Sequence, residues 1–403
     1  MSFGVLFLIV ASGLLGPLFA GWKRLAVPLV VGEILAGIIF GNTGLHMINP
    51  ADPTLQFLSA VGFALLMFLV GTHLPLRDPN LRSALKTGFL ATGLAFAFAV
   101  PAGYLIGYLS GLPAPIFVLL LANSSAAVLM PIVHEQKLEG KTVLLTTTWV
   151  ALADAVTIVA LPLAMSPGKT LTIALGGALV LVVAIVSFFA LSRARNTAIM
   201  QHYRKMSKDR VWALDLRISL ALLLGLCWLA TSFGTSDLVA GFAAGAVVSL
   251  VGGPKRLTKQ LIGLGEGFFV PLFFVVLGAK LNFGTLFQSA SYLELTALIA
   301  VATIGVHLLV ARMVKLPMYS GLAASAQLGL PAAIVSLGLN SGVINSGQGS
   351  AIIAAALLSL ISTTIGTKLL AKNAALEIAN AHSAGDAPCI KPFCEEHDPS
   401  DEA

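Results

Sequence analysis

The chain has 403 residues, of which 57% are hydrophobic and 10% are charged, and its formal net charge is +6. A water-soluble globular domain carries about 25% charged residues. This chain therefore lacks the charge to cover a surface that faces water, and we expect the lipid bilayer to be the solvent for most of it. The three cysteines imply no disulfide framework.

Apolar stretches recur along the chain, separated by polar residues or by proline and glycine. They predict an all-α polytopic membrane protein of about 13 transmembrane helices. The predicted helices cover residues 3–21, 26–41, 54–73, 84–109, 114–134, 140–165, 170–192, 212–233, 236–252, 262–280, 290–314, 317–341 and 347–371. No basic residue precedes the first stretch, so we expect a membrane span there and not a signal peptide.

The lysines and arginines test this assignment. Of the 24 in the chain, 21 lie in alternate loops and in the tail, two (Lys169 and Lys280) lie in the opposite loops, and Arg217 lies near the start of a span. Positive charge concentrates on the cytoplasmic side of a membrane protein. We therefore predict an inner-membrane protein with its N-terminus outside and its C-terminus in the cytoplasm. The basic residues are topology signals on this interpretation, and no nucleic-acid partner is expected.

The most charged segment, residues 193–211, predicts a cytoplasmic linker between two halves of the membrane domain. We expect a transmembrane domain over 1–372, with halves of about 1–192 and 212–372, and a disordered cytoplasmic tail over 373–403. The sequence contains no glycine-rich phosphate loop, so neither an ATP-driven pump nor any other enzyme is expected. The tail residues Cys389, Cys394 and His397 do not have a standard zinc spacing. Hence we predict no metal site and no cofactor.

The second predicted helix carries Glu33 at mid-depth and ends in Gly37 and Gly41, four residues apart. Small residues at this spacing allow two membrane helices to pack closely. Glu33 either carries protons or supports the structure by hydrogen bonding to an unwound backbone, and we favour the structural role.

Two predicted helices are interrupted near their midpoints. The 114–134 helix contains Asn123-Ser124-Ser125, and the 317–341 helix contains Gln327-Leu-Gly-Leu-Pro331. These helices are the fifth and the twelfth predicted spans, seven apart in order. Because an odd separation reverses the direction in which a span crosses the membrane, they would be equivalent members of two inverted repeats. Broken helices in corresponding positions of two halves indicate a transporter site, because the half-helix ends and freed carbonyls bind ions. An ordinary proline kink in each helix is the alternative.

Asp154 lies at the centre of the 140–165 helix, level with both interruptions. A carboxylate there costs several kcal/mol, so such residues usually serve function. Asn123, Ser124, Ser125 and Thr148 would supply neutral oxygens to a cation beside it. His307, within the 290–314 helix, is either a packing residue or a pH-sensitive group.

Several of these segments resemble the monovalent cation:proton antiporter-2 family, the Kef-type exchangers. They are Pro28 to Gly41, Asn123 to Pro131, Leu152-Ala153-Asp154 and Pro271 to Gly278. The similarity runs over about residues 5–370. It implies the sodium/proton antiporter fold, with crossed discontinuous helices, a core that moves against a scaffold, and a homodimer formed through the scaffold. Asp154 matches the ion-binding aspartate of the family.

Three positions depart from the family pattern. Ala153 replaces the usual Asp or Asn, neither Thr303 nor Ile304 is the lysine often found there, and Leu330 replaces a glutamate. With Asp154 as the sole carrier, both the protonated form and the cation-loaded form are neutral. We therefore predict an electroneutral exchanger of Na⁺ or K⁺ for H⁺. The alternatives are a sodium-coupled organic solute symporter of the same architecture and a channel or transport-dead sensor.

Overall fold

The computed structural model describes residues 2–20, 29–72, 81–165, 170–210, 212–233, 235, 237–252 and 255–383, and no strand occurs among them. The elements are α1 Phe3–Gly13, α2 Leu15–Ala20, α3 Leu29–Phe40, α4 Pro53–Thr72, α5 Leu81–Ser110, α6 Ala114–Ala122, α7 Ala126–Glu135, α8 Lys141–Met165, α9 Thr170–Arg195, α10 Ala198–Asp209, α11 Leu214–Ser232, α12 Asp237–Val251, α13 Lys255–Leu264, the π-helix η2 Gly265–Phe269, α14 Val270–Lys280, α15 Phe283–Gln288, α16 Ala290–Met313, α17 Met318–Ala324, α18 Gly329–Ser341 and α19 Ser346–Ser383.

The predicted spans correspond to helices throughout. Within the described residues, nine helices are long and apolar enough to cross a membrane. Four further apolar segments are shorter, namely Phe3–Leu18, Leu29–Phe40, Ala114–Met130 and Asp237–Val251, and each lies inside one predicted span. The all-α polytopic fold is thus confirmed. The count of about 13 spans stays a prediction, because these four segments fall below the usual length of a span.

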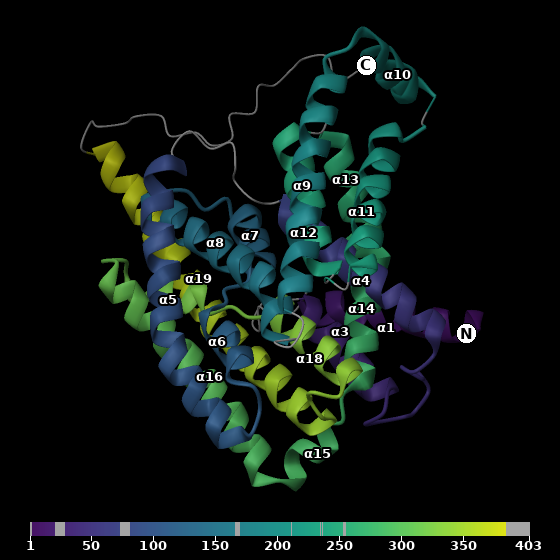
Figure 1. The fold of residues 1–403 in the computed structure, drawn as a ribbon. Coiled ribbons are helices and arrows are strands. Elements are labelled where there is room, and N and C mark those ends of the chain that lie inside the picture. The colour runs from purple at the N-terminus through teal and green to yellow at the C-terminus, as the bar shows by residue number, and fades with distance from the viewer. Residues whose placement is uncertain are drawn as a thin grey trace.

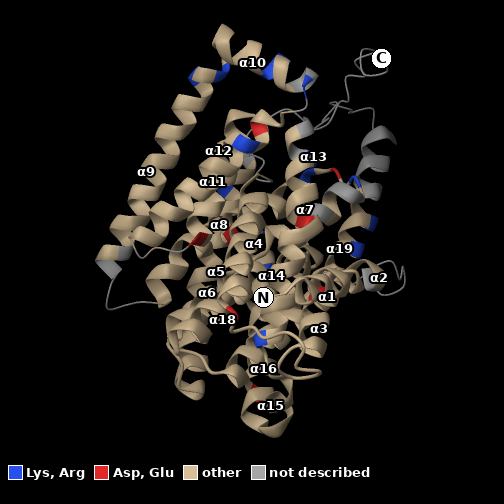
Figure 2. Cartoon of the chain, turned by 90° about the vertical axis from the view of Figure 1, so that its right-hand side faces the viewer, with Lys and Arg blue, Asp and Glu red and all other residues tan. Residues whose placement is uncertain are grey.

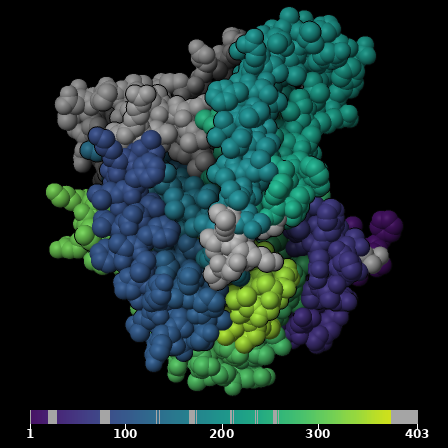
Figure 3. Space-filling view, viewed as in Figure 1, coloured from purple at the N-terminus to yellow at the C-terminus, as the bar shows by residue number. Residues whose placement is uncertain are grey.

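The helices gather in two bundles (Figure 1). The core bundle consists of α5 to α8 and α15 to α19, and the scaffold bundle consists of α1 to α4, α9 and α11 to α14 with η2. Packing within each bundle is much more extensive than packing between them, where α8 meets α9 and α12 and α4 meets α7. Figure 3 shows this division at the surface, with the blue core residues on one side and the purple and teal scaffold residues on the other.

Glycines bring two scaffold helices, α3 and α14, into direct backbone contact. A Cβ atom added to Gly37 would lie 2.1 Å from the Val275 carbonyl oxygen, and one added to Gly41 would lie 2.2 Å from the Ala279 Cα. No side chain fits into such gaps, so only glycine permits this approach. The small-residue packing face predicted for the second helix is confirmed, and α14 is its partner.

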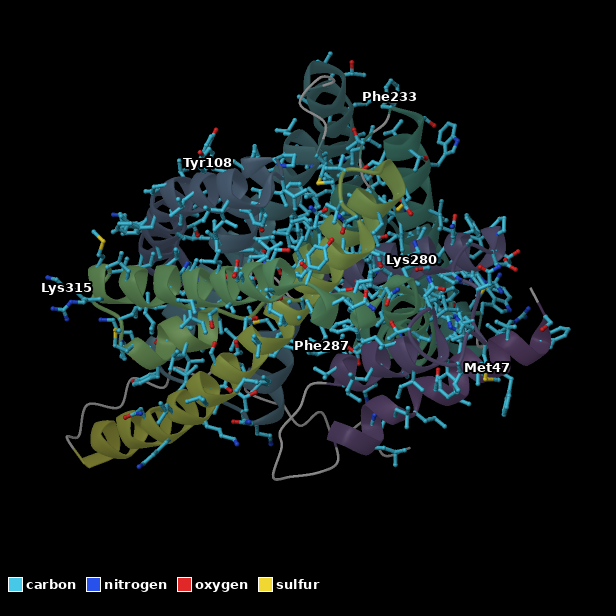
Figure 4. The ribbon with its side chains drawn as sticks, turned by 90° about the horizontal axis from the view of Figure 1, so that it is seen from below. Met47, Tyr108, Phe233, Lys280, Phe287 and Lys315 are labelled. Carbon is cyan, nitrogen blue, oxygen red and sulfur yellow. The ribbon has the colours of Figure 1, made fainter. Side chains whose placement is uncertain are left out.

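Large apolar side chains cover the outside of both bundles. Tyr108 is 86% exposed, Phe287 is 75% exposed and Trp228 is 72% exposed. Figure 4, viewed from below, shows Tyr108 and Phe233 at the periphery of the molecule. An apolar outer surface of this extent requires lipid around it.

Basic side chains gather toward one end of the molecule, around α10 and α13, and others lie on the C-terminal half of α19 (Figure 2). Here α10 occupies most of the segment predicted as a linker. Arg204 on α10 pairs with Asp215 at 2.8 Å, and the Arg195 guanidinium donates to the carbonyls of Val251 and Gly252 at the end of α12. A cation is favourable at a helix C-terminus. The one-sided charge agrees with the predicted asymmetry, whereas the membrane orientation stays a prediction.

The last helix is longer than predicted. α19 continues to Ser383, past the boundary at residue 372 that we expected between the membrane domain and the tail. The rest of the predicted tail, residues 384–403, lies outside the described residues, and Cys389, Cys394 and His397 lie there with it.

Candidate functional site

Both predicted interruptions are true breaks in helices. α6 ends at Ala122, Asn123 is extended with φ −74° and ψ 144°, and α7 begins at Ala126. Asparagine and serine side chains compete with the helix for backbone hydrogen bonds, which favours a break at this sequence. α17 ends at Ala324, and α18 begins at Gly329. Each break leaves carbonyls at the end of one half-helix and N–H groups at the start of the next.

Hydrogen bonds join the two breaks directly. The Ser125 N–H donates to the Ala326 carbonyl at 2.8 Å. The Ser124 hydroxyl donates to the Ala324 carbonyl at 2.5 Å, across 200 residues of sequence. The backbone groups freed by one break are therefore satisfied by the other. This is the arrangement expected of crossed discontinuous helices.

Gln327, in the second break, supports the first break. It is 1% exposed, and its amide nitrogen donates to the Leu120 carbonyl in the last turn of α6. The same nitrogen donates to Thr303 Oγ1 at 3.2 Å. Thr303 is one of the two positions, with Ile304, at which the family resemblance implies a lysine, and here its hydroxyl takes part in a neutral hydrogen bond.

Asp154 lies on α8 against the start of α7. It is 3% exposed, and its Oδ2 accepts the N–H of Ala126, the first residue of α7, at 2.9 Å. The N-terminus of a helix carries partial positive charge, which stabilises a carboxylate. Ala153 beside it is fully buried, so an apolar methyl group stands at the position where the family resemblance implies Asp or Asn.

Thr157 belongs to the site, although the sequence analysis did not identify it. Its hydroxyl contacts Asn123 Oδ1 at 2.8 Å and the carbonyls of Ala153 and Asp154 at 2.8 and 3.0 Å. Thr157 therefore links α8 to the first break, one turn beyond Asp154. The sequence contained a signal for this residue, because Thr157 is three residues after Asp154 and residues three apart share a face of a helix.

Several polar atoms in this region are buried without a hydrogen-bond partner. They include Ser125 Oγ, Asn123 Nδ2, Thr148 Oγ1 and Trp149 Nε1. A buried polar atom without a partner is costly unless a ligand or water satisfies it. Ser125 lies next to Ala126 and so beside the Asp154 contact, whereas Thr148 lies about 9 Å before Asp154 along α8. The Thr148 methyl group faces Gly88 on α5.

His307 lies against the first break. It is fully buried on α16, with Nδ1 2.8 Å from the Thr303 carbonyl and Nε2 3.1 Å from Ser124 Oγ. Its ring stacks on Trp149 of α8 at 5.6 Å between centroids and 25° between planes. The predicted residues Asn123, Ser124, Gln327 and His307 thus meet around the crossing.

Glu33 lies apart from this cluster. It sits on α3 in the scaffold bundle, where α3 packs mainly against α14, α2 and α1. It is 5% exposed, and its Oε2 has no hydrogen-bond partner. Its two predicted roles, carrying protons and hydrogen bonding to an unwound backbone, stay predictions. Leu330, the residue in place of the family's glutamate, is buried at the start of α18.

The comparisons with known proteins give one family. The family model described as "Sodium/hydrogen exchanger, transmembrane" matches residues 10–373. The candidate Na⁺/H⁺ antiporter YjbQ of Bacillus subtilis is 30% identical over 318 residues, which cover 74% of this chain and 50% of that protein. The Na⁺/H⁺ antiporter of Enterococcus hirae is 27% identical over 312 residues, covering 74% of this chain and 78% of that one. This chain thus spans about half of the length of the Bacillus relative.

A further relative and a solved structure agree with this result. The glutathione-regulated potassium-efflux protein KefC of Klebsiella pneumoniae is 27% identical over 65% of this chain and 43% of its own length. The sodium proton antiporter MjNhaP1 of Methanocaldococcus jannaschii, solved at pH 8, superimposes with a TM-score of 0.63 at 16% identity. The match covers 92% of this chain and 97% of that one. At this level of identity the structural match establishes the fold.

Proposed function

Because the chain belongs to the sodium/hydrogen exchanger family, whose members are transporters rather than enzymes, we propose that it exchanges Na⁺ or K⁺ for H⁺ across the membrane. Asp154 carries the proton and the cation in turn. The relatives named above include exchangers of sodium and a system for potassium efflux. The proposal therefore concerns a monovalent cation and leaves both ions as substrates to be tested.

The observation that carries this proposal is the environment of Asp154. Its carboxylate is buried and receives a single N–H from the start of α7, while Ser125 Oγ nearby has no partner. A carboxylate oxygen with neutral oxygens around it suits a hard monovalent cation. The same carboxylate can hold a proton instead, so the two ligands exclude each other at one site.

Charge balance gives the stoichiometry. Asp154 is neutral when protonated and neutral with one monovalent cation bound, so either loaded form can move through the membrane interior at low electrostatic cost. The empty carboxylate is negatively charged, so it cannot move through the membrane interior at low electrostatic cost. The buried methyl group of Ala153 offers no second carboxylate to carry a further charge. One cation for one proton, without net charge movement, is the exchange that these residues favour.

The proposal includes the assembly and its orientation. We expect a homodimer formed through the scaffold bundle, in a cell inner membrane, with the N-terminus outside and the C-terminus in the cytoplasm. The distribution of lysine and arginine supports this orientation. The family resemblance supports the dimer. The core bundle would move against the scaffold bundle to expose Asp154 to each side in turn, and the sparse packing between the bundles suits such a movement.

The test is transport by the purified protein in liposomes. A pH gradient is formed, and the recovery of a pH-sensitive dye is followed after Na⁺, K⁺ or Li⁺ is added. Asp154→Asn should abolish the response, because the amide cannot exchange a proton for a cation. Asp237→Asn is the matched control, since Asp237 begins α12 in the scaffold and should retain exchange. Cation-dependent dye recovery in Asp154→Asn would refute the assignment.

A further inference from the structure

A hollow lies at the end of the scaffold bundle, beneath α10, which crosses from α9 to α11 (Figure 1). It holds about 480 Å³ of empty space, counting its open side. Its walls are mostly apolar and come from five helices, α9 to α13, and three charged side chains line it, namely Arg195, Arg204 and Asp215. It shares no residue with the site around Asp154, so a ligand bound here would have a separate role.

Contacts near both ends of α10 hold this helix over the hollow. Met200 and Arg204 are four residues apart, on one face of α10, and both line the hollow. The Arg204 guanidinium pairs with Asp215 in the first turn of α11 at 2.8 Å. One turn further along α10, Ser207 Oγ accepts the Leu214 N–H at 3.0 Å. The side chain of Arg204 is therefore fixed in the wall of the hollow.

A neighbouring face of α10 is suited to the boundary between membrane and water. Ile199 and Tyr203, four residues apart, are exposed, and so is Trp212 shortly after the helix. Tyrosine and tryptophan are enriched at the level of the lipid headgroups. An amphipathic helix with basic residues and an exposed apolar face lies in the plane of that boundary. The hollow beneath α10 is thus at the depth of the headgroups.

Both arginines of the hollow keep N–H groups for a ligand. Arg195 uses Nη1 for both of its hydrogen bonds within the described residues, to the Val251 and Gly252 carbonyls. Arg204 uses Nη2 for Asp215, and its Nε is buried without a hydrogen-bond partner. A guanidinium has five N–H donors and no acceptor. A buried donor without a partner is costly unless a ligand or water accepts from it. The unused donors therefore point to a ligand that offers several acceptor oxygens.

The charge of the hollow gives the sign of that ligand. Two guanidinium groups face one carboxylate, which leaves one positive charge in excess. The segment 193–217 has the same bias, with seven lysines and arginines against two acids. Figure 2 shows basic side chains on α10. The apolar walls exclude water and strengthen the attraction between opposite charges. Guanidinium groups bind phosphate through paired N–H···O bonds, so a phosphate group satisfies both the charge and the donors.

We propose that the hollow beneath α10 is a binding site for a phosphate group, which lies between Arg195 and Arg204. The same chemistry is offered by the headgroup of an anionic lipid and by a soluble phosphate ester. The position of α10 at the level of the headgroups favours the lipid. Asp154 takes no part in this site, so the proposal does not rest on the proposed function, and Asp154→Asn should bind the phosphate ligand as the wild type does.

The test is native mass spectrometry of the purified protein in detergent, titrated with phosphatidylglycerol or with phosphatidylcholine. We expect phosphatidylglycerol to bind about tenfold more tightly, and Arg195→Gln and Arg204→Gln each to weaken it about tenfold. Arg193→Gln is the matched control, because Arg193 is exposed on α9, two residues from Arg195 and outside the hollow. Equal losses in Arg193→Gln and Arg204→Gln would show attraction to the basic surface in general and would overturn the proposal.

A second variant tests the hollow without removing a charge. Ala194→Leu should fill part of the space and weaken phosphatidylglycerol about tenfold, while the pair of Arg204 with Asp215 is kept. This variant decides the matter if the arginine variants do not fold, and unchanged binding in it would overturn the proposal. Competition with glycerol 3-phosphate or inorganic phosphate separates the two sources. Displacement of the lipid by either one assigns the site to a soluble phosphate, and retention of the lipid assigns it to the headgroup. Equal affinity for the two lipids, with no binding of either soluble probe, would also overturn the proposal.

Discussion

Replacing Gln327 with methionine removes the side chain that bridges the two breaks while keeping its length and most of its volume. In the protein, the amide nitrogen donates to the Leu120 carbonyl and to Thr303 Oγ1. Leu120 lies in the last turn of α6, where carbonyls have no partner within the helix. The thioether of methionine donates no hydrogen bond. The variant therefore leaves a buried backbone carbonyl without a donor.

The size of the effect follows from these two contacts. An unsatisfied buried acceptor costs about 1–3 kcal/mol, and hydrogen bonds between membrane helices contribute about 0.6 kcal/mol on average. Thr303 Oγ1 can turn toward its own helix, so most of the loss comes from Leu120. We expect Gln327→Met to lower the free energy of unfolding by about 2 kcal/mol.

The assay is unfolding of the purified protein in mixed micelles, followed by tryptophan fluorescence. Gln56→Met is the matched control, because the Gln56 amide also donates to a carbonyl, that of Pro50 at 3.4 Å, but in an exposed position. The control should change stability by less than about 0.5 kcal/mol. Equal losses in the two variants would refute the reasoning that Gln327 holds the break through a buried bond.

Two further variants test the packing of the scaffold and the support of the site. Gly37→Ala should prevent close packing of α3 on α14 and lower the yield and thermal stability of the folded protein, because its methyl group would lie 2.1 Å from the Val275 carbonyl oxygen; Gly93→Ala, with open space around it, should leave both unchanged. A folded Gly37→Ala of wild-type stability would contradict the contact. Thr157→Val should raise the KM for the cation about tenfold, since Asn123 loses one hydrogen bond, and Thr157→Ser should restore it. Equal KM values in these two variants would exclude a role for the hydroxyl.

Much of the architecture could be predicted from the sequence. Hydropathy is a property of consecutive residues, so the positions of the apolar helices followed from the sequence. The mid-membrane depth of Asp154 follows from the same pattern and stays a prediction. The breaks were visible for the same reason, because Asn123-Ser124-Ser125 interrupts an apolar run locally. Glycine spacing predicted the packing face on α3, although the partner α14 was not identifiable from it.

The partners of these residues were decided only by the tertiary structure. Ser124 meets Ala324 across 200 residues and His307 across 183, and no local pattern relates positions so far apart. The sequence by itself thus determined which helices are interrupted and which residues stand at the interruptions. The crossing of the helices decided which of them touch, because contacts depend on the packing of whole helices and hydropathy depends only on neighbours in the chain.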